Sequence, residues 1–380
     1  EVRITYLVSE GDITNGASPF SYKLGQLSTG KVSEASRIEQ GNVSVRTVSK
    51  AAGGAPAEDI NSIKYNAPLS FISQERAVTS DDYKSLIMKN FSGIDNVIAW
   101  GGETQDVPQF GKVYVSVKPT AAEFLTTGQK QEILSYLQGK KVVGLIPEIV
   151  DPEYTYIYFE LFFKYDPSAT TQSGGGLEAS VRTTLNNYNR TRLNNFDGIY
   201  RHSNLLTSVD LSDPAILSTV ARVYCYKNVN ITTSTADTHV AEFDFLVDGS
   251  VDQKESMISS SAFLVNGTRT FLKDRPIPND SVKREIYTVR GSDTGEGSEL
   301  TANVGFLFVN NGRVELNNLV HDNNETIEVR LRPASDDVIS KQKKILQIDV
   351  DKTLIKGQPD TVAISGSSGA TTYTTFTRDA

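Results

Sequence analysis

The chain has 380 residues and a formal net charge of −8, and its pI lies near 5.1. This length exceeds what one ordinary core needs, so two or three domains are expected. The acidic balance, without a clustered basic stripe, argues against direct binding of nucleic acid. Hydrophobic residues make up 38%, slightly few for a compact globule, which favours an elongated protein or one that completes its burial against partners.

The single cysteine, Cys225, excludes a disulfide within the chain and lies in an apolar run typical of a buried small side chain. The sequence contains neither a signal peptide nor an apolar stretch of membrane-spanning length, so we expect no membrane insertion. The first residue is Glu1 rather than Met, which is compatible with a processed product or a part of a longer protein.

The first 56 residues read as a β-rich segment. Apolar and polar residues alternate from Val2 to Val8, and Asn15-Gly16 is a turn signal. Small residues from Ala51 to Pro56 break the pattern. A short helix is expected over Ala57–Tyr65, stopping before Pro68 because proline disfavours helical backbone in the residue before it.

Residues 57–232 alternate between strand and helix patterns, which predicts a central α+β domain. A helix begins after Thr79, with Asp82 as the acidic partner of a capping box and Val78 and Tyr83 placed for a hydrophobic staple. A second helix is capped by Thr126 and has Gly139 at the position after its end. The other expected elements are strands over 96–100, 112–117, 154–165 and 220–226, and a helix around 177–188.

From residue 233 to the C-terminus the helical period disappears and an antiparallel β-rich domain is expected. Alternation over 241–247 predicts a half-solvated strand, and further strands are expected over 327–331 and 345–350. Asn266-Gly267 and Asn311-Gly312 are hairpin signals. The end, from Ser365 to Ala380, is rich in Gly, Ser and Thr and is expected to fray or wrap a neighbour.

One string, NAPLSFISQERAVTSDDY from Asn66 to Tyr83, resembles the baseplate J-like family of contractile phage tails. The order of its parts also matches, because a Gly-Gly pair and an acidic residue precede the Ala-Pro, and Arg-Ala-Val-Thr and Asp-Tyr follow it. Downstream, the stretches from Trp100 to Glu103 and from Gly111 to Val115 look most like the large wedge subunit of T-even-type phage baseplates. The residues of this structural motif are Gly53, Gly54, Glu58, Pro68, Arg76, Thr79, Asp82, Tyr83 and Gly111.

The resemblance implies a structural subunit of the virion, located in the tail baseplate after assembly in the host cytoplasm. In such a family, subunits make homodimeric contacts, bind other wedge proteins and close a ring that couples baseplate rearrangement to sheath contraction. Rigid domains would then rotate about linkers. The candidate linkers are Ala51–Pro56, Pro167–Gly176 and Asn230–Thr238.

Candidate catalytic chemistry is weak. The three histidines, His202, His239 and His321, are far apart and none has a partner at zinc-ligand spacing. The acidic loop from Gly291 to Glu299 lacks the order of a calcium loop, and a solvated loop is preferred. Gly174–Gly176 lacks the phosphate-loop spacing and reads as a hinge at a helix start. We therefore expect no enzyme, and no catalytic, cofactor-binding or metal-binding residues.

Two other functional classes are open: a tail adhesin or receptor-binding module that uses the β-rich C-terminal half, and a wall-degrading hydrolase. The aromatic strand from Tyr154 to Tyr165 is either a doubly covered core strand, which we prefer, or a strand with one face against another chain. Arg76 is expected to assist folding by pairing with Asp81 or Asp82.

Overall fold

The structure is a computed structural model. It describes residues 74–360, apart from 106, 233–237, 249–255, 292–296, 320, 340 and 342, and before them residues 13, 17, 18, 60, 63, 64, 67, 68 and 71. The strands expected before residue 56, the motif residues Gly53, Gly54 and Glu58, and the tail from Ser365 lie outside the described residues. The chain divides into two compact units, Glu1–Asp151 and Pro152–Ala380.

Described helical residues lie on both sides of the point at which the sequence predicted a stop. Ile60, Ile63 and Lys64 are helical as expected, but Ala67, Pro68 and Phe71 are helical too. Tyr65 and Asn66 lie outside the described residues, so the expected end of the helix before Pro68 stays a prediction. Proline lacks only the N–H donor that the first turn of a helix leaves unused, so a helical Pro68 is compatible with a helix start.

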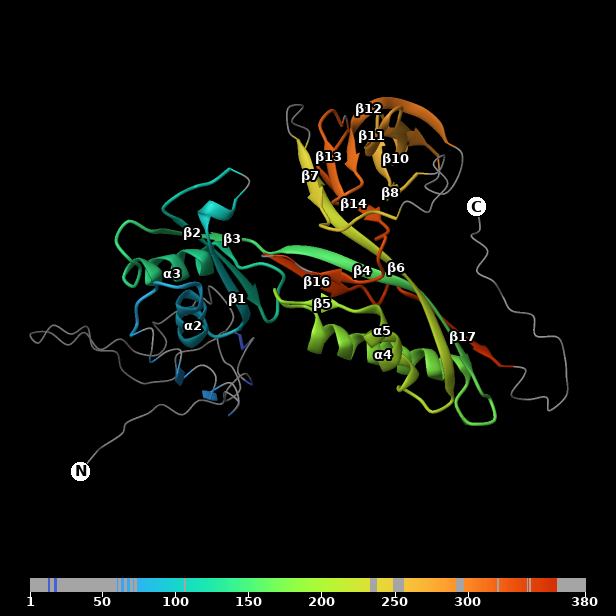
Figure 1. Cartoon of the computed structure of the whole chain (residues 1–380), viewed down its shortest axis with the longest axis horizontal. Coiled ribbons are helices and arrows are strands. Elements are labelled where there is room, and N and C mark those ends of the chain that lie inside the picture. The colour runs from blue at the N-terminus through green and yellow to red at the C-terminus, as the bar shows by residue number, and fades with distance from the viewer. Residues whose placement is uncertain are drawn as a thin grey trace, which may run out of the picture. The chain divides into compact units, whose positions relative to one another are not determined.

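The described part of the first unit is a three-stranded sheet with two helices (Figure 1). Strand β1 pairs antiparallel with β2, and β2 pairs parallel with β3 after a crossover through α3. Parallel strands need such a crossover, because a short turn can join only antiparallel neighbours. The elements are α2 (Ser80–Asn90), β1 (Ile94–Gly101), η3 (Gly102–Thr104), β2 (Lys112–Pro119), α3 (Thr127–Gln138) and β3 (Ile146–Val150).

Both helices of this unit begin where the sequence predicted, at complete capping boxes. In α2, Asp82 N–H donates to the Thr79 hydroxyl (3.2 Å), and Thr79 N–H donates to the Asp82 carboxylate (2.8 Å). Gly139 ends α3 in ordinary right-handed backbone (φ −81°), so its position does not depend on the left-handed freedom of glycine. Val78 is 59% exposed, so the expected staple to Tyr83 is not a buried contact.

The second unit is built on a long, mixed sheet, here called the main sheet. Its strand order is β16-β4-β6-β14-β8, and β17 pairs with β4 beyond the end of β16. Helices α4 and α5 lie along it (Figure 1), and a two-stranded ribbon joins β5 and β15. The elements are β4 (Glu153–Tyr165), α4 (Gly174–Arg192), β5 (Ile199–Tyr200), α5 (His202–Asp210), β6 (Ile216–Ile231), β8 (Ile258–Ser260), β14 (Glu325–Leu331), β15 (Val338–Ile339), β16 (Lys344–Ile348) and β17 (Leu354–Pro359).

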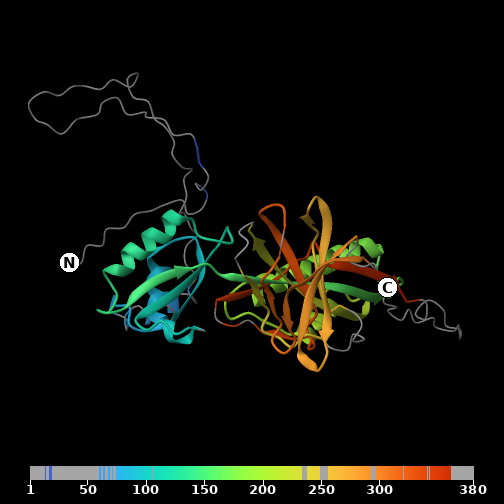
Figure 2. The same ribbon diagram turned by 90° about the horizontal axis from the view of Figure 1, so that it is seen from above.

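A second sheet of six strands is inserted between β6 and β14; only the short β8 of that stretch joins the main sheet. We call it the upper sheet; its order is β7-β13-β12-β11-β10-β9 and every pairing is antiparallel. Figure 2 shows its orange strands crossing in front of the green main sheet. Its strands are β7 (His239–Glu242), β9 (Phe263–Val265), β10 (Thr268–Ile277), β11 (Asp280–Arg290), β12 (Ser298–Phe308) and β13 (Arg313–Leu316).

Both predicted hairpins are present in the upper sheet. Asn266 and Gly267 have φ of 50° and 71° and join β9 to β10, as the Asn-Gly signal requires. Gly312 (φ 63°) precedes β13 in the connection from β12. The strand expected over 241–247, however, ends at Glu242, because Asp244 takes left-handed backbone (φ 60°) that leaves the ladder. Helix α5 was not predicted at all.

The protein is thus α+β and rich in strands, as the sequence indicated. One apolar core runs through the second unit, from residues of β4 and β6 under α4 and α5 to residues of the upper sheet. The first unit has a separate core of residues from α2, α3 and the three strands. Strands from before and after residue 232 share the main sheet.

Candidate functional site

The predicted motif residues that the structure describes have roles in folding. Thr79 and Asp82 cap α2, and Tyr83, 1% exposed, is buried in the first core, where burial raises the pKa of its hydroxyl. Arg76 donates to the side-chain oxygen of Gln74 (2.7 Å), whereas Asp82 accepts from the cap backbone. The structure therefore brings Thr79, Asp82 and Tyr83 together at one helix start.

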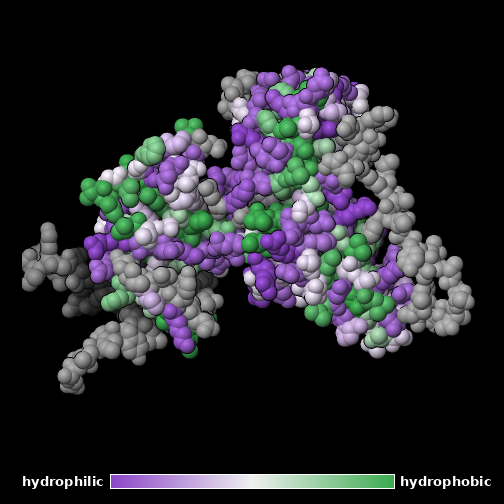
Figure 3. All heavy atoms as spheres, viewed as in Figure 1, coloured by the Kyte–Doolittle hydropathy of each residue, from purple (hydrophilic) through white to green (hydrophobic). Residues whose placement is uncertain are grey.

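Gly111, the last motif residue described, marks a junction of two loops. Its φ is +80°, and its carbonyl oxygen accepts from Ile146 N–H (2.8 Å) where β2 and β3 begin side by side. The two loops that meet there expose large apolar side chains, and Figure 3 shows hydrophobic colouring on this side of the first unit. They are Val107 (74% exposed), Phe110 (84%), Val142 (40%) and Val143 (98%), and Ile146 (56%) follows them as the first residue of β3. Exposed apolar groups of this kind are typical of protein–protein contact sites.

The groups weighed for catalysis that the structure describes have structural surroundings. Within the described residues, no cluster of three or more His, Cys, Asp or Glu could hold a metal ion. Both ring nitrogens of His321 face backbone carbonyl oxygens, those of Asn323 (2.7 Å) and Thr232 (2.8 Å). The ring therefore connects two segments of backbone. Burial raises the pKa of the Cys225 thiol, which makes it a poor nucleophile.

The glycine-rich stretches also have structural positions. Gly174–Gly176 form the first turn of α4, whose cap is Ser173, as the sequence predicted for a helix start. The loop from Gly291 to Glu299 lies largely outside the described residues, and Glu299 itself pairs with Arg275 (2.9 Å). Among the described helices, none has the length and apolar character needed to cross a membrane.

The aromatic strand β4 has two unlike faces. Ile157, Phe159, Leu161 and Phe163 are at most 2% exposed and lie in the core. On the opposite face, Tyr156 stacks on Tyr226 of β6 (4.8 Å between ring centroids) and Tyr158 stacks on Tyr224 (5.3 Å). Cross-strand aromatic pairs stabilise a sheet. Tyr226 is 6% exposed, whereas Tyr156, Tyr158 and Tyr224 are partly exposed, and tyrosines at a surface also suit an interface. One face of the strand therefore belongs to the core, and the interpretation of the other face as a contact with another chain stays a prediction.

Charged side chains surround these tyrosines and are already paired within the chain. Lys352 lies over the Tyr226 ring (3.8 Å) and pairs with Glu328. The Tyr226 hydroxyl donates to Asp349 (2.6 Å), and burial together with this carboxylate raises its pKa. The side chains of the tyrosine face are therefore held in place by contacts within the chain.

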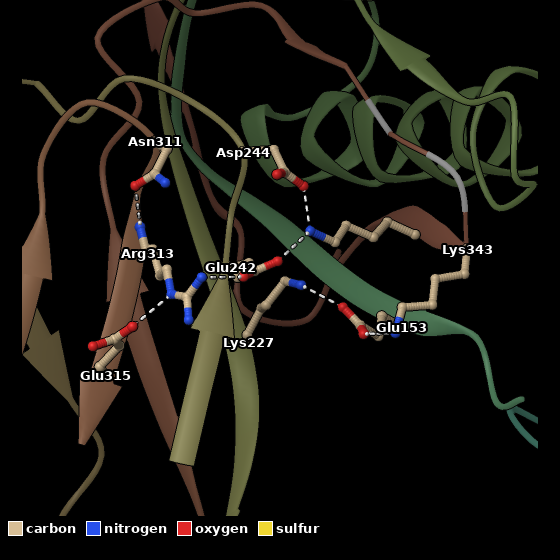
Figure 4. Close-up of polar contacts among 9 residues, drawn as sticks. Glu153, Lys227, Glu242, Asp244, Asn311, Arg313, Glu315 and Lys343 are labelled. Atoms are coloured by element: carbon tan, nitrogen blue, oxygen red, sulfur yellow. Dashed lines mark hydrogen bonds and ion pairs between the residues drawn. The ribbon is translucent and has the colours of Figure 1, made fainter. Parts of the chain in front are cut away.

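A seam of charged side chains crosses the second unit where the upper sheet meets the main sheet (Figure 4). Lys227 of β6 lies 3.4 Å from Glu153 of β4, which also pairs with Lys343 (2.6 Å). Lys344 of β16 pairs with Glu242 (3.4 Å) and with Asp244. Arg313 of β13 then joins Glu242 (3.2 Å) to Glu315 (2.8 Å). We call these eight residues the charge seam.

Burial dominates the electrostatics of the charge seam. Lys227 is 5% exposed, and burial lowers its pKa to about 8 against the opposing attraction of Glu153. For Glu153, burial acts to raise the carboxyl pKa, but Lys227 and the hydrogen bond from Lys343 outweigh it and the pKa lies below its usual range. A buried charge of this kind costs stability unless its partners compensate.

Sequence reasoning missed the charge seam, although one signal was present. The buried face of β6 reads Val223, Cys225, Lys227, Val229, so the lysine occupies a core position in an alternating strand. Such a position predicts a buried partner for the charge. The identity of that partner was not readable, because Glu153 lies 74 residues earlier in the chain.

Two family models match this chain, one on each side of the division between the units. Residues 79–150 match the model of baseplate structural protein gp6, C-terminal domain I, and residues 153–228 match that of C-terminal domain III of the same protein. Baseplate wedge protein gp6 of Enterobacteria phage T4 is 24% identical over 265 residues, which cover 69% of this chain and 39% of that protein. The chain thus spans about two fifths of the length of this relative.

A solved structure, the cryo-EM structure of the anti-feeding prophage baseplate, matches part of the chain. The TM-score is 0.33 at 16% identity, covering 47% of this chain and 42% of that one. The two family models and the T4 relative support a structural role in a phage baseplate. The matched stretches of this chain are thus similar to parts of a baseplate structural protein.

Proposed function

We propose that the chain is a wedge subunit of a contractile-tail baseplate that associates with copies of itself and with other wedge proteins. In this proposal the subunits form dimer contacts within a ring, and the ring couples rearrangement of the baseplate to contraction of the sheath. The observation that carries the proposal is the position of the two matched domains: residues 79–150 and 153–228 are adjacent and meet at the division between the compact units, after Asp151.

Two surfaces described above suit this role. One is formed by the exposed apolar side chains of the loops in the first unit, and the other by the stacked tyrosines of the second unit. We propose that these two surfaces meet neighbouring subunits. We also propose that the chain is related to the baseplate J-like proteins, as the motif at 66–83 led us to expect.

The proposal also covers the domain limits expected from the sequence, with a β-rich segment over 1–56, the central domain over 57–232 and a β-rich domain over 233–380. The end of the second match at residue 228 and the upper sheet, whose strands all lie between His239 and Leu316, favour the last limit. The main sheet argues against it, because β6 pairs with β14 across residue 232.

Analytical ultracentrifugation of the purified chain, alone and mixed with the other wedge proteins of the same particle, tests the proposal. We expect self-association at micromolar concentration and a larger complex on mixing. A strict monomer that binds none of these proteins would contradict it. Replacing Phe110 and Val143 by Ser gives a variant that should fold normally and lose part of the association.

A tail adhesin that uses the C-terminal half is a second candidate. The upper sheet lies outside both family matches and carries Lys283 over the ring of Phe306 (3.6 Å) on its solvent side. A glycan array separates the two functions, because a wedge subunit should show no preference among sugars.

A further inference from the structure

The two sheets of the second unit are joined differently at their two sides. At the β14 side the links are backbone hydrogen bonds, together with one ion pair between Arg332 and Asp248 (3.3 Å). Asp248 N–H donates to the carbonyl oxygen of Arg332 (2.9 Å), and Ala334 N–H donates to that of Leu246 (2.7 Å). Strand β8, which leads into the upper sheet, also pairs with β14.

A buried polar cluster reinforces this β14 side. Asp274 of β10 is 2% exposed and accepts from Ile258 N–H (2.8 Å) and the Ser256 hydroxyl (2.7 Å). It also pairs with buried Arg284. Backbone pairing and a satisfied buried cluster make this side costly to open.

At the opposite side of the main sheet, charged side chains make the connection. Lys343 and Lys344 of the β16 segment, Glu153 of β4 and Lys227 of β6 lie on three neighbouring strands, and Glu242 and Asp244 face them from the end of β7 (Figure 4). Of these side chains, Lys344 is the one whose ammonium group reaches both carboxylates of the upper sheet. Ion pairs hold such an edge in one register but contribute little net stability.

We propose that the charge seam is a latch: the upper sheet parts from the main sheet first at the β7–β16 side and pivots about the β14–β8 side. The apolar core between the sheets resists full separation, so the motion is a local opening of the β7 and β13 edge. This inference rests on the geometry of the second unit and does not depend on the proposed function.

Hydrogen exchange of the full chain, measured by mass spectrometry, tests the latch. Lys344→Met removes the ammonium group and keeps the length of the side chain. We expect amides of β7 and β13 to exchange about tenfold faster or more, since the partly buried Asp244 loses its ammonium partner and Glu242 keeps only Arg313 of the two cations that it faces. Amides of β8 and β10 should change less than about twofold, because their attachment is intact.

Two further variants make the test specific. Asp244→Asn removes the other charge and tolerates the left-handed backbone at that position, so it should give the same pattern even if Lys344→Met folds poorly. Lys118→Met is the matched control: Lys118 is 4% exposed, pairs with Asp95 (2.6 Å) and lies in the first unit. It should leave β7 and β13 unchanged. Equal acceleration in all strands of the upper sheet, or none in β7 and β13, would overturn the latch.

Discussion

The two units stabilise their sheets by different means. In the first unit, local signals dominate: each helix starts at its own capping box, and a small core of apolar residues joins the helices to three strands. In the second unit, strands that are more than 150 residues apart pair directly, as β4 does with β16 and β17, and charged groups are buried among them. A sheet assembled from distant segments needs interactions that favour one strand register over others, and buried ion pairs can do this.

The largest expected effect tests whether the two units are stabilised separately. Phe159 of β4 is 0% exposed and its ring lies 5.5 Å from that of Tyr200. Phe159→Ala should lower the free energy of unfolding of the second unit by about 3–5 kcal/mol, because a large cavity is left. In calorimetry, the unfolding transition of the second unit should shift to a lower temperature, and that of the first unit should keep its temperature.

The control for this comparison is Phe110→Ala, which changes a side chain that is 84% exposed. It should change stability by less than about 0.5 kcal/mol. If Phe159→Ala moved every transition by the same amount, the units would unfold as one block and the comparison would fail.

The next effect concerns the buried charge of Lys227, whose pKa falls from 10.5 to about 8 on folding. The unfolded chain then binds more protons between pH 8 and 10.5, so this group makes stability rise with pH across that window. Lys227→Met should stabilise the second unit by roughly 1–3 kcal/mol at pH 7, with the gain vanishing above pH 10. Urea unfolding at several pH values measures it. A lower stability at pH 7 would show that the charge is well compensated.

A smaller effect is expected at the helix caps of the first unit. Thr79→Ala removes the hydroxyl that accepts from Asp82 N–H and should cost about 1 kcal/mol. Thr79→Ser keeps the acceptor and should cost much less. Thermal unfolding of the first unit reports both changes, and equal losses for the two variants would contradict a capping role.

An effect of about the same size tests a local signal within the second unit. Gly267 has φ 71°, and no atom lies within 4 Å of the position where a Cβ would be placed. Gly267→Ala should therefore cost about 1 kcal/mol through backbone conformation alone. Urea unfolding measures the change, and Gly128→Ala, in α3 with equally open space, should stabilise slightly. A loss far above this value would mean that the turn also controls the strand pairing around it.

The sequence by itself determined the local elements: the capped starts of α2 and α3, the alternation of β4 and β6, and the Asn-Gly hairpin of the upper sheet. These follow from the preferences of neighbouring residues, which the chain carries wherever it folds. The motif around Thr79 also indicated a baseplate protein, although its residues serve folding rather than chemistry.

Only the tertiary structure decided which strands lie side by side and what covers them. Glu242 and Asp244 read as the polar face of a solvated strand, yet they meet Lys344 from a segment 100 residues further on. Helix α5 was missed because its burial depends on β6, with which it packs, rather than on a capping signal of its own. The physical reason is the same in both cases: side-chain burial and ion pairing depend on distance in space, and sequence separation does not reveal that distance.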